Sequence, residues 1–183
     1  MKKVYLVHGW GGNSDTKLFN WIKEELKQKA EVYAFDMPDT ENPKINAWVN
    51  FLEENVKEID NETYFVGHSI GCQTILRFLE KLDVEVKIAG CVFVAGWFNL
   101  QDDLSDEEKK IAKSWIETPI DIEKVKKHCD NFLALFSTND PYVPLSDREL
   151  FKARLNAKTI TKESKGHFDD VTKIEEVLEF ITR

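Results

Sequence analysis

Residues 63–79, TYFVGHSIGCQTILRFL, decide the fold. The β-branched and aromatic run Thr63 to Val66 predicts a strand, and Cys72 to Leu79 predicts a helix. Gly67-x-Ser69-x-Gly71 lies between them, where glycines let a strand and a helix approach closely around a strained turn. A serine at such a turn projects its hydroxyl above the end of a sheet. The stretch therefore predicts a parallel sheet that presents Ser69 at one edge.

Strand-like and helix-like segments alternate on both sides of this stretch. That rhythm predicts an α/β fold, a three-layer α/β/α sandwich with about six mostly parallel strands. Apolar residues at helical spacing predict further helices around Lys17–Gln28, Ile45–Val56, Leu145–Leu155 and Ile174–Ile181. The expected strands are Val4–Val7, Glu31–Phe35, Thr63–Val66, Ile88–Val94, Phe132–Ser137 and Lys158–Thr161.

Composition limits the class of protein and its partners. With 42% hydrophobic and 32% charged residues, the 183-residue chain is expected to form one globular domain, 1–183, and not a disordered or collagen-like chain. The net charge of −8 predicts no nucleic-acid partner. No apolar run is long enough for a membrane span, and Val4 to Val7 is too short for a signal-peptide core. Three cysteines without C-x-x-C spacing favour a reducing compartment, so we expect a cytoplasmic protein.

Residues 98–130 form the longest segment between two expected strands and predict a small helical insertion. Ser105 and Glu108 have the spacing of a capping box, and Pro119 ends the helix that follows. The charged residues of this segment have two interpretations. They form a solvated face, or they belong to a small cap over a site, and the aromatic side chains of that cap then face the substrate.

Ser69 needs a base and an orienting acid before it can act as a nucleophile. For this kind of turn the chain order is serine, acid, histidine. His167 follows the last expected strand, and Asp140 lies just past the carboxyl end of the preceding strand, where ligands of open α/β sheets bind. Asp140 also fits a turn residue before Pro141 that accepts backbone hydrogen bonds.

The remaining aspartates near His167, two other histidines and the cysteines are expected to have roles in the structure and not in catalysis. Asp169 and Asp170 are alternative acids, although Asp170 suits the N-cap of the last helix. We expect His68 to pack or to form a local hydrogen bond, and His128 to lie on the surface. Cys72 and Cys91 fall on apolar stretches and are expected to be buried thiols.

The glycine-rich segment after the first strand, residues 8–12, predicts a loop that aims a backbone N–H at the reacting oxygen. Such an oxyanion hole takes a second N–H from the residue after the nucleophile. Trp10 and Ile70 are the expected donors, and His8 either orients the loop or touches the substrate. The segment lacks G-x-G-x-x-G, which argues against a nucleotide, and no cluster has metal-ligand spacing. We therefore predict neither a cofactor nor a metal.

These motifs resemble the α/β-hydrolase superfamily, and more closely its small serine hydrolases related to retinoblastoma-binding protein 9 and to YdeN-type bacterial proteins. The resemblance rests on residues 8–12, 36–43, 67–71, 139–144 and 166–168. It implies a reduced α/β-hydrolase fold with Ser69, Asp140 and His167 as the catalytic triad. A retinoblastoma-protein partner is not implied, because no cysteine here lies in a Leu-x-Cys-x-Glu motif.

Together these features predict a serine hydrolase that cleaves an ester, thioester or amide of a small molecule or peptide through an acyl-enzyme. Trp97 and Phe98 are expected to line the substrate pocket, and Trp115 to line the pocket or belong to the core. The alternatives are a non-catalytic, hydrolase-like module that binds a protein partner of unknown identity, and an aminopeptidase.

Overall fold

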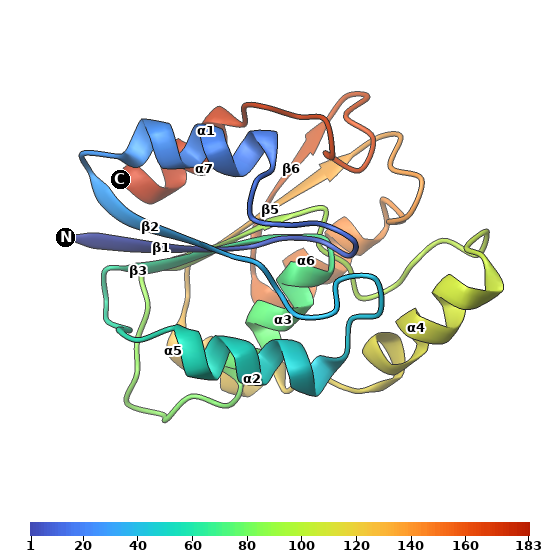
Figure 1. Cartoon of the computed structure of the whole chain (residues 1–183), viewed down its shortest axis with the longest axis horizontal. Helices are drawn as coiled ribbons and strands as arrows, with labels where there is room; N and C mark the ends of the chain where they lie inside the picture. The colour runs from blue at the N-terminus through green and yellow to red at the C-terminus, as the bar shows by residue number, and fades with distance from the viewer.

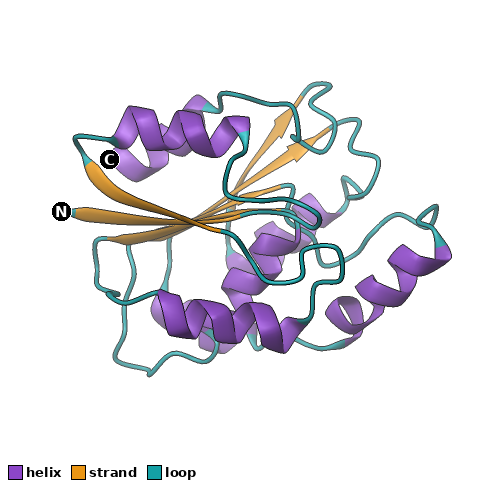
Figure 2. Cartoon of the chain, in the orientation of Figure 1, coloured by secondary structure: helices purple, strands orange, loops and turns teal.

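The computed structural model describes all 183 residues and is built around a six-stranded sheet in which every neighbouring pair is parallel (Figure 1, Figure 2). The spatial order of the strands is β2-β1-β3-β4-β5-β6. The predicted α/β class and number of strands are therefore confirmed. The strands are β1 Lys2–Val7, β2 Ala30–Phe35, β3 Thr63–His68, β4 Gly90–Val94, β5 Phe132–Ser137 and β6 Lys158–Lys162.

Helices cover both faces of the sheet and give the three layers expected (Figure 1). Helices α1 (Lys17–Leu26) and α7 (Glu175–Thr182) pack on one face. On the other face lie α2 (Ile45–Asn55), α3 (Ile70–Leu79), α5 (Ile122–His128) and α6 (Asp147–Leu155). Each face has its own buried apolar cluster, because neighbouring side chains along a strand point to opposite sides.

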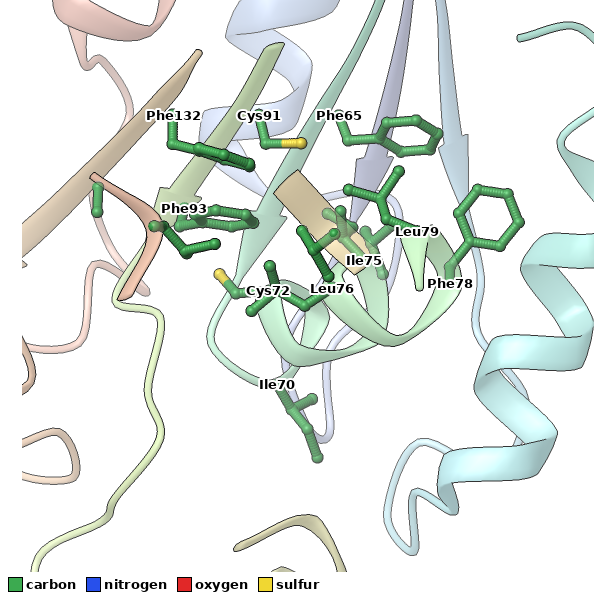
Figure 3. Packing of buried hydrophobic residues seen from close by; sticks show 14 of the residues in the cluster. Phe65, Ile70, Cys72, Ile75, Leu76, Phe78, Leu79, Cys91, Phe93 and Phe132 are labelled. Atoms are coloured by element: carbon green, nitrogen blue, oxygen red, sulfur yellow. The ribbon is translucent and has the colours of Figure 1, made fainter. Parts of the chain in front are cut away.

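Helix α3 is the most deeply buried helix, because every one of its ten residues is buried. It packs against β3 and β1, and its apolar side chains share one buried cluster with Phe65, Phe93 and Phe132 (Figure 3). Each phenylalanine buried in this way contributes roughly 1.5–3 kcal/mol to stability. The helix that follows Ser69 is thus fixed against the centre of the sheet.

The segment between β4 and β5 contains both α5 and α4 (Asp106–Glu117). Helix α5 packs against α3, whereas α4 lies to the side of the layers (Figure 1). The predicted capping box is present: the Ser105 hydroxyl accepts from the Glu108 N–H, and the Glu108 carboxylate accepts from the Ser105 N–H. Buried Arg77 of α3 donates to carbonyls at the end of α4, which ties α4 to the core.

The chain connectivity marks one end of the sheet for ligand binding. From β1 the chain crosses to β2 on one side, and β3 then pairs with the other side of β1. The loops that leave β1 and β3 at their carboxyl ends therefore flank a topological switch point, where open α/β sheets bind ligands.

None of the helices combines the length and apolar character needed to cross a membrane.

Candidate active site

Ser69 lies at the tight turn between β3 and α3. Its backbone has φ 52° and ψ −122°, a left-handed conformation that is costly for a residue with a side chain. The turn is held by the Ser69 N–H, which donates to the Val94 carbonyl over 2.9 Å. Ser69 occupies the N-cap position, but its side chain caps no N–H of α3. Its hydroxyl is therefore not committed to the helix.

Gly71 allows this turn to sit directly against the end of β1. A Cβ atom at residue 71 would lie 2.3 Å from the carbonyl oxygen of Val7 and 2.6 Å from that of His8. Both distances are far inside van der Waals contact with backbone atoms, which cannot rotate away. Only glycine lets α3 begin so close to the loop after β1.

Asp140 and His167 form a hydrogen-bonded pair across two loops. Nδ1 of His167 lies 2.8 Å from Oδ2 and 3.0 Å from Oδ1 of Asp140, and both side chains are largely buried. Oδ1 of Asp140 also accepts the N–H groups of Tyr142 and Val143. Asp140 is thus both a turn residue and the carboxylate that holds the imidazole.

Ser69 and His167 line one cavity of about 680 Å³, a volume typical of ligand-binding pockets. The loop after β1 forms one wall, and the start of α4 with the residues before it forms another. The remaining walls include Trp97, Tyr142 and Phe168. Four carboxylates but no lysine or arginine line the cavity: Glu41, Glu107, Glu108 and Asp169.

Two backbone N–H groups near Ser69 have no acceptor within the chain. In the loop after β1, Gly11 donates to Thr40 and Gly12 to Gly9, whereas the N–H of Trp10 has no acceptor within the chain. Ile70 is the first residue of α3, so its N–H precedes the helical hydrogen-bond ladder. Trp10 thus lies in the loop after β1 and Ile70 at the start of α3, the two segments that flank the switch point.

Comparison with known proteins identifies the family of this chain. The family model described as "Serine hydrolase" matches residues 4–177. The chain belongs to the serine hydrolase family. It is 26% identical over 168 residues to the hydrolase YdeN of Bacillus subtilis, covering 91% of this chain and 86% of that protein. It is 27% identical over 177 residues to serine hydrolase RBBP9 of Rattus norvegicus, covering 96% of this chain and 86% of that protein.

Solved structures show the same fold. The crystal structure of the ydeN gene product from B. subtilis has a TM-score of 0.88 at 25% identity and covers all of this chain and 97% of that one. Est1E of Butyrivibrio proteoclasticus, with ferulic acid bound, has a TM-score of 0.73 at 17% identity, with coverage of 100% and 87%. The predicted resemblance and the α/β-hydrolase fold are confirmed, and the protein is a hydrolytic enzyme.

The other two histidines near the site of this serine hydrolase have lowered pKa values. His8 is fully buried outside the cavity, where its ring bonds the Gly9 carbonyl and the Met37 N–H. Burial lowers the pKa of His8, although the bond to Gly9 opposes the shift. The pKa of His68 falls to about 3, first because of burial and then because of the adjacent His167. His8 thus orients the loop, and His68 bonds the His167 carbonyl at 2.7 Å.

These lowered pKa values predict that stability decreases in mild acid. Below pH about 6.5 the unfolded chain protonates both imidazoles, whereas the folded chain protonates them only at lower pH, because both pKa values are lowered. The unfolded state then binds more protons, so the free energy of unfolding falls by up to about 1.4 kcal/mol per pH unit for each histidine. Urea unfolding at pH 7 and pH 5.5 measures the effect, and His68→Gln should show a smaller loss. Equal losses in the two proteins would contradict a neutral His68.

Three expectations are corrected by the structure. Phe98 does not line the Ser69 cavity and instead lines a separate, smaller one, because the chain turns after Trp97. His128 is buried at the end of α5, where Nδ1 bonds the Val86 carbonyl at 2.8 Å. Asp170 caps no helix, since α7 starts at Glu175 and Asp170 pairs with Lys17. Trp97 lines the Ser69 cavity, and Trp115 belongs to the core.

Sequence reasoning missed several residues around the His167 loop. The ring of Tyr142 packs edge-on against the imidazole of His167, with 5.0 Å between ring centroids. The side chains of Ser137, Thr138 and Asn139 accept backbone N–H groups of the same loop. The sequence does contain a run of small hydrogen-bonding side chains directly before Asp140. Nothing near this run in the sequence indicates that it binds the loop at residues 164–166.

Proposed function

We propose that this hydrolase cleaves carboxylic esters through a covalent acyl-enzyme, with Ser69 as nucleophile, His167 as base and then acid, and Asp140 as the orienting carboxylate. The observation that carries the proposal is the Asp140–His167 pair, whose imidazole lines the same cavity as the strained Ser69. The preserved order of serine, acid and histidine along the chain supports it further.

The geometry supports the following steps. Because Asp140 accepts the Nδ1–H of His167, Nε2 is left without a proton and serves as the base. Nε2 takes the proton of Ser69 while Oγ attacks the ester carbonyl carbon, and the carbonyl electron pair moves onto oxygen. The N–H groups of Trp10 and Ile70 stabilise this oxyanion. The oxyanion then re-forms the carbonyl and the ester C–O bond breaks, while the imidazolium protonates the leaving oxygen to give the alcohol. Water, deprotonated by His167, attacks the acyl-enzyme in the same way, and the bond to Ser69 Oγ breaks to release the acid.

Esters are favoured over amides because an alkoxide leaves more readily than an amide anion, so ester cleavage needs less precise protonation of the leaving group. An esterase of Pyrococcus furiosus shares the fold, with a TM-score of 0.63 at 18% identity, which is consistent with this choice. Rapid mixing with a p-nitrophenyl ester tests the proposal. We expect a burst of p-nitrophenol with an amplitude near the enzyme concentration, since acylation by this activated ester releases the phenol faster than the acyl-enzyme is hydrolysed. Turnover no faster than in buffer would contradict it.

The carboxylates that line the cavity predict discrimination by charge. None of Glu41, Glu107, Glu108 and Asp169 pairs with a lysine or arginine, so their field repels an anionic substrate. We expect the p-nitrophenyl ester of a monocarboxylic acid to have a kcat/KM about tenfold or more above that of a matched ester with a second, free carboxylate.

Salt and a matched pair of variants test this discrimination. The ratio of the two kcat/KM values should shrink as ionic strength rises, because the charges are exposed and screened. Glu107→Gln should also shrink it, whereas Glu85→Gln, which removes an exposed carboxylate before β4, should not. A ratio that is independent of both salt and Glu107 would assign the discrimination to shape instead.

A further inference from the structure

We propose that Asn139 is a positioning residue, whose side-chain oxygen fixes the loop that presents His167. The inference rests on the proposed function, because it concerns the placement of the proposed base. Its starting point is a set of contacts between two runs of four successive residues, 137–140 and 164–167. Each side chain of the first run accepts one hydrogen bond from the second run. Three of the donors are backbone N–H groups: Ser164 N–H to Thr138 Oγ1 at 3.1 Å, Lys165 N–H to Ser137 Oγ at 2.9 Å, and Gly166 N–H to Asn139 Oδ1 at 2.8 Å. The fourth donor is Nδ1 of His167, which lies 2.8 Å from Asp140 Oδ2.

The loop between β6 and α7 needs such support because its backbone is strained. Ser164, Gly166 and Phe168 have φ values of 52°, 54° and 64°, all in the left-handed region. For residues other than glycine this conformation costs of order 1–3 kcal/mol each and persists only where surrounding contacts impose it. Three of the four contacts above bind backbone N–H groups of this stretch, and thus stabilise this one conformation of the loop.

Asn139 is the central member of the set. Its Oδ1 accepts both the Gly166 N–H at 2.8 Å and the Ser137 hydroxyl at 2.9 Å, which uses both lone pairs of the oxygen. Gly166 directly precedes His167, so a shift of its N–H moves the imidazole relative to Ser69. Misplacement of a catalytic group by about 1 Å can lower a rate by about 10²-fold.

The opposite side of the loop is held independently. Nε2 of His68 bonds the His167 carbonyl at 2.7 Å, and buried Phe168 anchors the next residue in the core. Loss of Asn139 alone should therefore loosen the imidazole without unfolding the loop. Asn139 is itself exposed, so its replacement leaves the apolar core unchanged.

The test compares steady-state kinetics of ester hydrolysis for wild type, Asn139→Ala and Asn139→Asp. We expect Asn139→Ala to lower kcat by about 10- to 100-fold with little change in KM, because substrate contacts are intact. Asn139→Asp keeps the accepting oxygen and should recover kcat to within about threefold of wild type. Its added carboxylate should also move the acid limb of the pH–rate profile to higher pH, because it stabilises the imidazolium.

Asn131→Ala is the matched control. Asn131 is an exposed asparagine just before β5, and its Nδ2 donates to the Ala89 carbonyl far from the His167 loop. Its kcat should equal that of wild type. An Asn139→Ala enzyme with wild-type kcat, or equal damage from Ala and Asp, would overturn the positioning role while leaving the proposed function in place. An inactive wild type would instead overturn the proposed function and, with it, this role.

Discussion

Replacement of Ser69 by alanine should lower kcat/KM for a p-nitrophenyl ester by on the order of 10⁴- to 10⁶-fold, because no acyl-enzyme can form. The loss should appear without a change in fold, since the Ser69 hydroxyl caps no helix N–H. Steady-state assays beside circular dichroism and urea unfolding measure both quantities. A smaller side chain at φ 52° leaves the backbone strain in place, so the midpoint of unfolding should change little.

The residual activity of Ser69→Ala is informative too. Two N–H groups and the cavity would remain, and such features alone accelerate hydrolysis by about 10³- to 10⁴-fold over water in a comparable triad enzyme. A Ser69→Ala enzyme that retained a tenth of the wild-type rate would place the nucleophile elsewhere. Cys72 is not a credible substitute, because it is fully buried and burial raises its thiol pKa well above the usual range.

Gly71→Ala should be the most damaging replacement of any glycine in the chain by alanine. Its Cβ would lie 2.3 Å from the Val7 oxygen and 2.6 Å from the His8 oxygen, so α3 and the end of β1 must separate. Overpacking against side chains lowers the free energy of unfolding by about 1–3 kcal/mol. A clash with fixed backbone atoms should lower it by about 3 kcal/mol or more, because these atoms cannot move away. Activity should fall as well, because the separation moves Ile70 and Trp10 apart.

Gly90→Ala provides the control for Gly71→Ala. There a Cβ would meet the ring of Phe180 at 2.7 Å, and a side chain can rotate away whereas a backbone carbonyl cannot. Urea unfolding should therefore show a smaller loss for Gly90→Ala, and its kcat should be unchanged because Gly90 starts β4 away from the site. Equal stability losses in the two variants would contradict the proposed close approach of α3 to β1.

Much of the fold could be predicted from sequence because each strand carries its own pattern. Strand β5 has the predicted bounds, Phe132–Ser137, because a polar turn follows this apolar run. Elsewhere the boundaries depended on neighbours: β3 continues to His68 because His68 pairs with Val94 of β4. Helix α6 starts at Asp147 and not Leu145, because the buried Asp147 carboxylate accepts the backbone N–H groups of Phe98 and Asn99.

The residues of the candidate site also differ in whether the sequence alone could predict them. Ser69, Asp140 and His167 could be named because each follows a strand and their order is fixed by one kind of turn. Asn139 and Tyr142 could not, because their partners lie more than twenty residues away in a loop of irregular conformation. The burial of His128 was missed for a related reason, since its bond to Val86 depends on how α5 packs.

The most direct test of the account is the reaction of the wild-type protein with a fluorophosphonate, followed by intact mass and peptide mapping. We predict one adduct per chain, located on Ser69, because His167 acts as the base that activates this hydroxyl. Adducts on another residue, or an unmodified folded protein, would contradict the assignment of Ser69 as a nucleophile activated by His167 and Asp140.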